Sequence, residues 1–522
     1  MKAVTSKQMK ELDRKAIADF GIAGDVLMDR AGHGVAETVQ FLARIAGCDN
    51  PLIQLIAGRG NNGGDAFVAA RYLKERGYEV EVWLAAEAGA ATGDALKHLS
   101  KLKAAKITLH ELPTKGEWDD EASASDLSGC ILVDGILGTG LSGPARGPAA
   151  GAISYINALA SRNLVVAIDV PSGLNSDTGK AEGDVVVADI TATMGLPKRG
   201  LLEPEAIEYV GTVEVVDIGL PPELTDRAQS DMEMITAADL REILGRRPRN
   251  AHKGMFGHVL IIGGAPGYAG AVALAAEAAA RSGAGLVTVL VPATVAPVVA
   301  GMIPEAMVHG GAQTEAGSLA ADCLAKWGRR LGDFSAVLMG PGMTTHEDTR
   351  VLVEQVLAES RAPVIVDADA LNVCAGRLDI LQKASGPIVL TPHPGEMARL
   401  MGSQVQDIQS DRFNAARRVA EQTSAVTVLK GAGTVVAAKG RLLNVNLTGN
   451  PGMASGGMGD VLSGLIAGLA AQGVAPFDAA RAGVYLHGRA GDNVAWRTSQ
   501  AGMIAGDVLD ELPSVFRESA LR

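Results

Sequence analysis

Residues 51–84, PLIQLIAGRGNNGGDAFVAARYLKERGYEVEVWL, decide the fold of the first half of the chain. They begin with an apolar run typical of a buried strand, pass through a glycine-rich turn into an amphipathic helical segment, and end in a second apolar run. That order is a βαβ unit. Further strands are expected at 130–134, 164–169 and 212–219. The pattern predicts a doubly wound, Rossmann-like parallel sheet with helices on both faces.

A second α/β series follows a polar, proline-bearing stretch at 219–230, which we predict to be a linker. Its buried-type strands end in Gly, Pro or Asp and are expected within HVLIIGG, VTVLVP, AVLMGPG, PVIVDAD, PIVLTPHPGE and AVTVLKGAG. A length of 522 residues also exceeds what one hydrophobic core usually supports. We therefore expect two domains, at 1–220 and 231–516.

Charge and cysteine content limit the partners and the compartment. The net charge of −12 provides no basic field for a nucleic acid or an anionic membrane. The four cysteines, which form no CxxC pair, argue against a disulfide framework or a structural zinc site. The first residues lack an apolar signal core, and the apolar stretch 286–300 is short and broken by prolines. We expect a cytoplasmic enzyme of small molecules.

Three loops of the first half combine polar and glycine residues after expected strands, where open α/β sheets bind ligands. They are GRGNNGGD (58–65), DGILGTGLSGPARG (134–147) and DVPSGLNSDTG (169–179). The first two have the glycine content of a phosphate cradle. Asp169 and Ser172 are placed to meet Asn62 and Asp134. The alternatives are an ordinary turn capped by Asp65, a flexible linker, and Asp169 as a cap.

Together these three motifs resemble NAD(P)H-hydrate epimerase over about residues 1–220. The resemblance implies that a potassium ion is held by Asn62, Asp134 and Ser172, all oxygen donors of the kind a hard cation prefers. Asp169 is our candidate general acid/base, because inversion of a ring hydroxyl needs a titratable group. The residues implied to contact the hydrated nucleotide are Asn61, Asn62, Gly63, Gly64, Asp65, Gly138, Thr139, Gly140, Leu141, Ser142, Gly143, Pro144 and Asp169.

The strongest signal of the second half is GGMGD (456–460), which runs directly into an apolar helix. A helix start is a ready anion site, and a carboxylate there repels phosphate unless it has a task. Deprotonating a hydroxyl that attacks a phosphoryl group is such a task, so Asp460 is the candidate base. The alternative is that Asp460 is a plain helix cap.

This signal resembles the anion hole of the ribokinase-like superfamily. Its companions AHKGMFGHVLIIGG, GYAGAVALAA, GPG, DADALN, TPHPGE and KGAGT match the NAD(P)H-hydrate dehydratase branch from about 231 to 515. The resemblance implies that Ala271, Gly342, His393 and Asp460 contact the hydrate. It implies that the nucleotide is held by Lys430, Gly431, Ala432, Gly433, Thr434, Asn450, Pro451, Gly452, Met453, Ala454, Ser455, Gly456, Gly457, Met458 and Gly459.

Met458 stands where the resembled family usually has threonine, so one hydroxyl near the phosphates is missing. His393, between two prolines, would alone suggest a structural turn residue. Asp367 and Asp369 of DADALN are as consistent with capping as with magnesium binding, so no metal is assigned to them.

The two resemblances imply one repair pathway. The first half interconverts the R and S hydrates of NADH and NADPH, and the second dehydrates the S hydrate with ADP and Mg²⁺, releasing AMP and phosphate. No residue distinguishes ADP from ATP. A homo-oligomer is expected because many relatives assemble.

Two rival functions stay open on the sequence. One is a kinase of a stable small alcohol, against which the N-terminal motifs count. The other treats the first half as a non-catalytic regulatory module, which could dispense with Asn62, Asp134 and Asp169.

Overall fold

The structure, a computed structural model, describes residues 1–141 and 143–520. The chain divides into two compact units, Met1–Met234 and Ile235–Arg522. Each unit is described by itself.

The first unit is built on a seven-stranded sheet of order β3-β2-β1-β4-β5-β6-β7, in which every neighbouring pair is parallel. β1, β4 and β6 are buried along their whole length, as expected of strands covered on both faces. The strands are β1 (Ile53–Ala57), β2 (Val80–Leu84), β3 (Thr108–Glu111), β4 (Ile131–Gly135), β5 (Leu164–Ile168), β6 (Ile190–Met194) and β7 (Thr212–Val216), and β8 (Met232–Met234) ends the unit.

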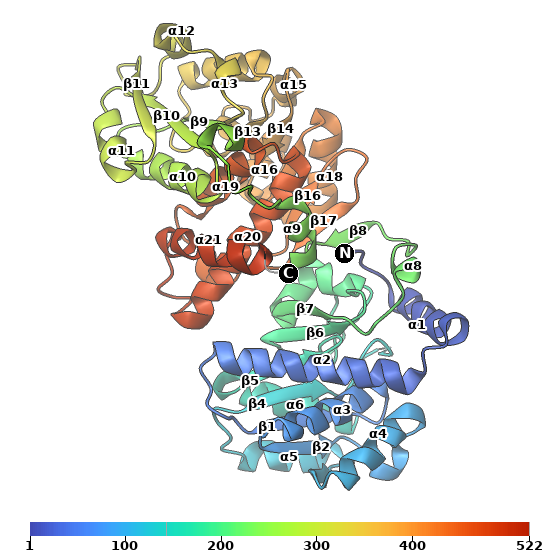
Figure 1. The fold of residues 1–522 in the computed structure, drawn as a ribbon. Coiled ribbons are helices and arrows are strands. Elements are labelled where there is room, and N and C mark those ends of the chain that lie inside the picture. The colour runs from blue at the N-terminus through green and yellow to red at the C-terminus, as the bar shows by residue number, and fades with distance from the viewer. Residues whose placement is uncertain (142, 521–522) are drawn as a thin grey trace. The chain divides into compact units, whose positions relative to one another are not determined.

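Helices cover both faces of this sheet (Figure 1). The long helix α2 lies with α3 and α4 on one face, while α5 and α6 pack on the other, where Trp118 and Tyr155 join the core beneath Ile56 and Leu132. The helices are α1 (Ser6–Phe20), α2 (Gly24–Ile45), α3 (Asn61–Glu75), α4 (Gly93–Ala104), α5 (Lys115–Ala124), α6 (Pro148–Leu159), α7 (Ile207–Val210) and α8 (Pro222–Thr225).

The sheet of the second unit runs in the order β11-β10-β9-β12-β13-β14-β15-β16-β17. It is parallel from β11 to β15, and β15-β16-β17 is an antiparallel meander. The strands are β9 (His258–Ile262), β10 (Leu286–Pro292), β11 (Met307–Gly311), β12 (Ala336–Met339), β13 (Val364–Val366), β14 (Ile388–Leu390), β15 (Val426–Leu429), β16 (Thr434–Ala437) and β17 (Leu443–Asn446).

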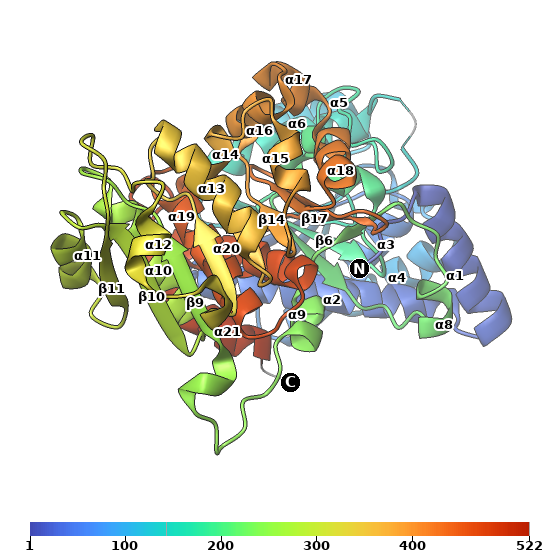
Figure 2. The same cartoon turned by 90° about the horizontal axis from the view of Figure 1, so that it is seen from above.

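Four small-residue helices, α10, α19, α20 and α21, form one layer of this unit, and α13–α16 and α18 lie across the strands from them (Figure 2). The helices are α9 (Ala237–Ile243), α10 (Ala269–Arg281), α11 (Ala296–Met302), α12 (Cys323–Trp327), α13 (Glu347–Glu359), α14 (Ala368–Asn372), α15 (Leu378–Gln382), α16 (Pro394–Met401), α17 (Val405–Ser410), α18 (Arg412–Thr423), α19 (Met458–Ala471), α20 (Pro476–Arg497) and α21 (Ala505–Ala520).

The predicted α/β class, with a Rossmann-like first sheet, is confirmed, with local differences. Strands β3, β6, β8, β11, β16 and β17 were not expected, and the polar stretch at 219–230 contains the short helix α8. The first glycine-rich loop is shorter than predicted, because α3 already begins at Asn61 with Gly60 as its N-cap. Among the described residues, no helix combines the length and apolarity needed to cross a bilayer.

Candidate active sites

Each sheet reverses its strand order at one point, and the carboxyl ends of the strands there form the crevice in which open α/β sheets bind ligands. In the first unit the reversal lies between β1 and β4, and in the second between β9 and β12. The loops that leave β1 and β4 are the first two predicted binding loops. The loops that leave β9 and β12 lead to Ala271 and Gly342.

Asp134 is the buried centre of the first crevice. Its carboxylate accepts hydrogen bonds from Ser172 Oγ at 2.6 Å, Ser172 N at 2.7 Å and Ile136 N at 3.2 Å. Asn62 Nδ2 donates to Leu137 O at 2.9 Å, and Leu137 N donates to Ser172 Oγ at 2.8 Å. The predicted potassium ligands Asn62, Asp134 and Ser172 are therefore gathered around the backbone of residues 136 and 137.

These three residues offer oxygen donors of different kinds, a carboxylate, a hydroxyl and an amide oxygen. Burial raises the pKa of Asp134 to about 6, against the hydrogen bonds from Ser172 and Ile136. Among the described residues, the hydrogen-bond donors to this carboxylate are backbone amides and a hydroxyl, and none is a basic side chain. A buried carboxylate that must ionise favours a cation, so the donor set fits a hard monovalent ion.

The NNGGD motif forms the first turn of α3 rather than a loop before it. The helix approaches the end of β1 so closely that a Cβ on Gly63 would lie 1.8 Å from Gly58 O. Asp65 is the fifth helical residue and therefore not the cap. Burial raises its pKa well above the ordinary value, and the charge of Asp169 adds to the rise. Asp65 and Asp169 thus belong to one electrostatic cluster.

Asp169 follows β5 with a φ of +67°, a left-handed conformation that is uncommon for non-glycine residues and that Asp adopts more readily than most. Its carboxylate forms an ion pair with Lys198 and accepts a hydrogen bond from Met194 N at 3.2 Å. The Lys198 side chain is only 1% exposed. Asp169 was expected beside Asn62 and Asp134, and the hydrogen bond and ion pair of its side chain are instead with Met194 of β6 and with Lys198, which follows that strand.

Sequence reasoning missed Lys198, because MGLPKRG carries no recognised motif and β6 itself was not expected. It also missed Asp13 of α1. Burial raises the pKa of Asp13 to about 6, with Lys198 opposing and Asp169 reinforcing the rise. Of the loop 138–144, Gly138 packs against Asn62, and Ser142 lies outside the described residues.

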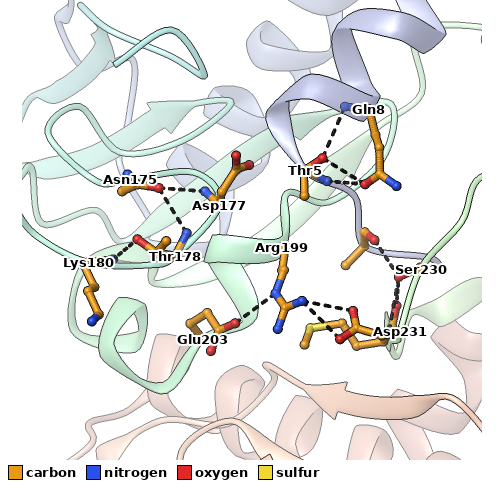
Figure 3. Close-up of polar contacts among 12 residues, drawn as sticks. Thr5, Gln8, Asn175, Asp177, Thr178, Lys180, Arg199, Glu203, Ser230 and Asp231 are labelled. Atoms are coloured by element: carbon orange, nitrogen blue, oxygen red, sulfur yellow. Dashed lines mark hydrogen bonds and ion pairs between the residues drawn. The ribbon is translucent and has the colours of Figure 1, made fainter. Parts of the chain in front are cut away.

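The segment that leads into α1 is fixed to the third predicted loop. Ser6 N and Oγ donate to Asp177 at 2.6 and 3.0 Å, and Thr5 and Gln8 form a capping box. A cavity of about 310 Å³ lies beside this anchor, lined in part by Arg199. The Arg199 guanidinium already pairs with Glu203 and Asp231 (Figure 3), so the cavity presents no free cation to a ligand.

Asp460 is the third residue of α19, whose N-cap is Gly457. The carboxylate is therefore not the cap, and the alternative of a plain capping role is wrong. Burial raises the pKa of Asp460 to about 7, and Asp367 adds to the rise while Lys430 opposes it. A carboxyl group with this pKa changes charge near neutral pH, as a general base requires.

Lys430 belongs to the predicted nucleotide loop, and its charge acts on Asp460. Its Nζ lies 2.9 Å from Asp367 Oδ1 and 3.7 Å from Glu396 Oε2, and a Cβ on Gly459 would lie 3.2 Å from the same Nζ. Burial lowers the pKa of Lys430, the two carboxylates raise it, and the net change is a rise. The lysine therefore stays charged at the start of α19.

His393 caps α16, with Nδ1 accepting from Gly395 N at 3.0 Å and Nε2 3.5 Å from Glu396 Oε1. The structural role that its neighbouring prolines suggested is thus real. Half of its side chain is exposed, so Nε2 is still accessible to a ligand. Burial lowers the pKa of His393, which keeps the ring neutral.

Three further groups of predicted residues are the loop after β12, the turn before GGMGD, and Met458. A Cβ on Gly342 would lie 2.6 Å from Tyr268 Cβ, which brings the loop after β12 to the start of α10 and Ala271. Asn450 donates to Asp492 at 3.0 Å and accepts from Gly452 N, which shapes the turn before GGMGD. Met458 is 6% exposed and belongs to the hydrophobic core. Its side chain therefore packs into the hydrophobic core, which differs from the environment near the phosphates that the resemblance implies for the family's threonine.

Fold and sites together define a two-domain α/β enzyme with a separate crevice in each domain. A family model described as NAD(P)H-hydrate dehydratase matches residues 259–514, and one described as YjeF-related protein N-terminus matches residues 24–200. The chain is 43% identical over 520 residues to the bifunctional NAD(P)H-hydrate repair enzyme Nnr of Moorella thermoacetica, covering 99% of this chain and 97% of the relative.

The Escherichia coli enzyme of the same name is 37% identical over 511 residues, covering 96% of this chain and 92% of the relative. A Bacillus subtilis ADP/ATP-dependent NAD(P)H-hydrate dehydratase, co-crystallised with ATP and Mg²⁺, is 33% identical, covers 55% of this chain and 98% of its own, and gives a TM-score of 0.48. The chain belongs to the bifunctional NAD(P)H-hydrate repair enzymes. The predicted pairing of an epimerase half with a dehydratase half is thereby confirmed.

Proposed function

We propose that this chain restores hydrated NADH and NADPH in two steps, with Asp169 and Asp460 as the catalytic groups. The first unit interconverts the R and S hydrates. The second dehydrates the S hydrate with ADP as co-substrate and releases AMP and phosphate. Spontaneous hydration gives both epimers, so the first step makes the whole pool available to the second.

Epimerisation requires a hydroxyl to leave a ring carbon beside nitrogen and return on the other face. One group must donate a proton to the departing oxygen, and one must take it from the returning water. Asp169 stands at a strand end, is 14% exposed and is paired with a buried ammonium. A ligand can therefore reach its carboxyl group, which we assign as the general acid/base that gives a proton to the departing hydroxyl and takes one back from the returning water.

Dehydration requires a better leaving group than hydroxide. Asp460 takes the proton of the ring hydroxyl, whose oxygen attacks the terminal phosphorus of the nucleotide, and AMP departs when that nucleotide is ADP. The ring nitrogen then expels phosphate, and loss of a proton from the adjacent ring carbon restores the dihydronicotinamide. The observation that carries this proposal is Asp460 itself, a non-capping carboxyl group of pKa about 7 at a helix start.

The two metal ions enter this proposal differently. Asn62, Asp134 and Ser172 would hold potassium, which neutralises the buried carboxylate and fixes the loop after β4. Asp367 is already bound by Lys430 and Thr391, and Asp369 by Thr344 and Asn372. We therefore infer that magnesium enters with the nucleotide phosphates, whose charge it screens, rather than in a cage of these carboxylates.

A cytoplasmic location and a homo-oligomer complete the proposal. The four cysteines are unpaired, as a reducing compartment requires. The oligomer rests on the family resemblance, and size-exclusion chromatography with light scattering tests it.

The deciding experiment follows recovery of the reduced-nicotinamide absorbance from a mixture of both NADPH hydrate epimers, with K⁺, Mg²⁺ and either ADP or ATP. Wild type should consume the whole pool. Asp460→Asn should recover nothing, and Asp169→Ala should consume the S epimer and then continue at the spontaneous inversion rate. Chelation of Mg²⁺ should stop recovery while leaving epimerisation. No recovery by wild type with either nucleotide would make a kinase of a stable small alcohol the better reading.

A further inference from the structure

The Asp169–Lys198 ion pair is the centre of a partly buried cluster of charges that also contains Asp13 and Asp65. Lys198 Nζ, besides its contact with Asp169, donates to Met194 O at 2.8 Å and to Thr193 Oγ1 at 3.2 Å. The ammonium therefore has no rotational freedom to leave the carboxylate. Three carboxyl groups share this one cation, so their charges cannot all be balanced at once.

Asp13 is the unexpected member, because it lies on α1, outside the residues 24–200 that the family model of this half matches. Its Oδ1 is buried and has no hydrogen-bond partner among the described residues. Such an orphaned carboxyl oxygen costs free energy unless it has a function or a charge partner. The charges that act on Asp13 are those of Lys198 and Asp169, and Asp13 in turn acts on Asp65.

The backbone fixes α1 to the segment that carries Lys198. Val4 N donates to Pro197 O at 2.9 Å, Arg199 N donates to Val4 O at 2.8 Å, and Val4 and Lys198 form a parallel β-bridge. The bond of Ser6 to Asp177 ties the first turn of the same helix to the loop that begins at Asp169. Two independent anchors therefore hold Asp13 at the cluster.

We propose that Lys198 and Asp13 are positioning residues of the epimerase site that act through Asp169, Lys198 by holding its carboxylate and Asp13 by competing for the same ammonium. The proposal rests on the proposed role of Asp169. It makes α1 part of the active site rather than an N-terminal extension of it.

The two residues must have opposite effects on the pH dependence of epimerisation. Without the Lys198 ammonium the cluster holds its proton more tightly, so the acid limb of the rate profile moves to higher pH. Without the Asp13 charge the cluster holds its proton less tightly, so the limb moves to lower pH. A residue with only a structural role would lower the rate at every pH and leave the limb in place.

The experiment uses the full chain and measures conversion of the purified R hydrate to the S hydrate between pH 5 and pH 9, with the spontaneous rate subtracted. Lys198→Met should lower the rate at pH 7 at least about tenfold and should shift the acid limb to higher pH by about one unit or more. Asp13→Asn should shift it down. Lys198→Arg, which keeps the charge, should restore the wild-type limb, and exposed Asp19→Asn on α1 and Lys180→Met should leave the profile unchanged.

Each outcome separates the proposals. Shifts in the same direction, or no shift in either variant, overturn the inference, and a shift in one variant alone overturns the assignment of the other residue. If circular dichroism shows that Lys198→Met does not fold, the shifts of the acid limb in Asp13→Asn and Lys198→Arg still test the proposal. An Asp169→Asn variant that epimerises at the wild-type rate overturns the proposed function itself, whereas failure of the inference leaves that variant inactive.

Discussion

A mostly buried lysine pairs with a strand-end aspartate in each unit, Lys198 with Asp169 and Lys430 with Asp367. A buried ion pair is expensive to form, and breaking one by removing a partner costs about 3–5 kcal/mol. Such pairs are therefore weak evidence for stability and better evidence for a function. In the first unit the pair contains the proposed catalytic carboxylate, and in the second it acts on the charge of the proposed catalytic carboxylate Asp460.

The charge around Asp460 predicts the pH dependence of dehydration. Asp460 acts as a base only when ionised, and burial and Asp367 raise its pKa to about 7, so the protonated fraction grows below that pH. Turnover of the S hydrate should rise to half its maximum near pH 7 and fall about tenfold per unit well below it. Asp367→Asn should move this limb to lower pH, because it removes a like charge and frees Lys430.

Stopped-flow or steady-state rates between pH 5.5 and pH 9 check this prediction. Asp379→Asn, at an exposed carboxylate that does not act on Asp460, is the matched control. A flat profile between pH 6 and pH 8 would contradict the assignment of Asp460, and an upward move in Asp367→Asn would contradict the proposed charge coupling.

At the scale of elements, the proposed anion hole at the start of α19 depends on how closely α19 approaches α10. A Cβ on Gly464 would lie 2.1 Å from the backbone oxygen of Ala275, and that oxygen cannot swing aside as a flexible side chain could. Gly464→Ala should therefore force the two helices apart and destabilise the second unit by about 3 kcal/mol, with loss of dehydratase activity.

Gly270→Ala is the control for that prediction, because a Cβ at Gly270 meets no atom within 4 Å in the same helix pair. It should be neutral or stabilise α10 by up to about 1 kcal/mol. Urea unfolding followed by circular dichroism compares the two variants. Equal midpoints would show that the helix contact is not what limits the second unit.

For the whole molecule, the division into two compact units predicts independent activities. Each unit has its own sheet, its own strand-order reversal and its own proposed catalytic carboxylate. Residues 1–234 and 235–522, produced separately, should each perform their own step, and the mixture should consume both epimers at a rate set by diffusion between them. Halves that are folded by circular dichroism yet inactive would refute this.

The sequence predicted the strands and the site residues to different extents. Apolar runs ending in Gly, Pro or Asp identified most of the central parallel strands, because a strand buried on both faces is apolar along most of its length. The buried strand β6, whose apolar run is interrupted by Thr191 and Thr193, was missed. The partly exposed edge strand β3 and the antiparallel pair β16–β17 carry weaker patterns, and they were missed. The glycine-rich motifs indicated the binding loops, although α3 starts earlier than its glycines suggested.

The sequence alone determined the α/β class, the family, and the motif residues Asp134, Ser172, Asp169 and Asp460, because each of these depends on local order along the chain. Only the tertiary structure brought Asp13, Asp65, Asp169 and Lys198 into one cluster, since these residues come from four separate segments and no motif joins them. It also placed Met458 in the core and removed the capping role from Asp460. Charge coupling and burial depend on distances through space, which the order of residues does not contain.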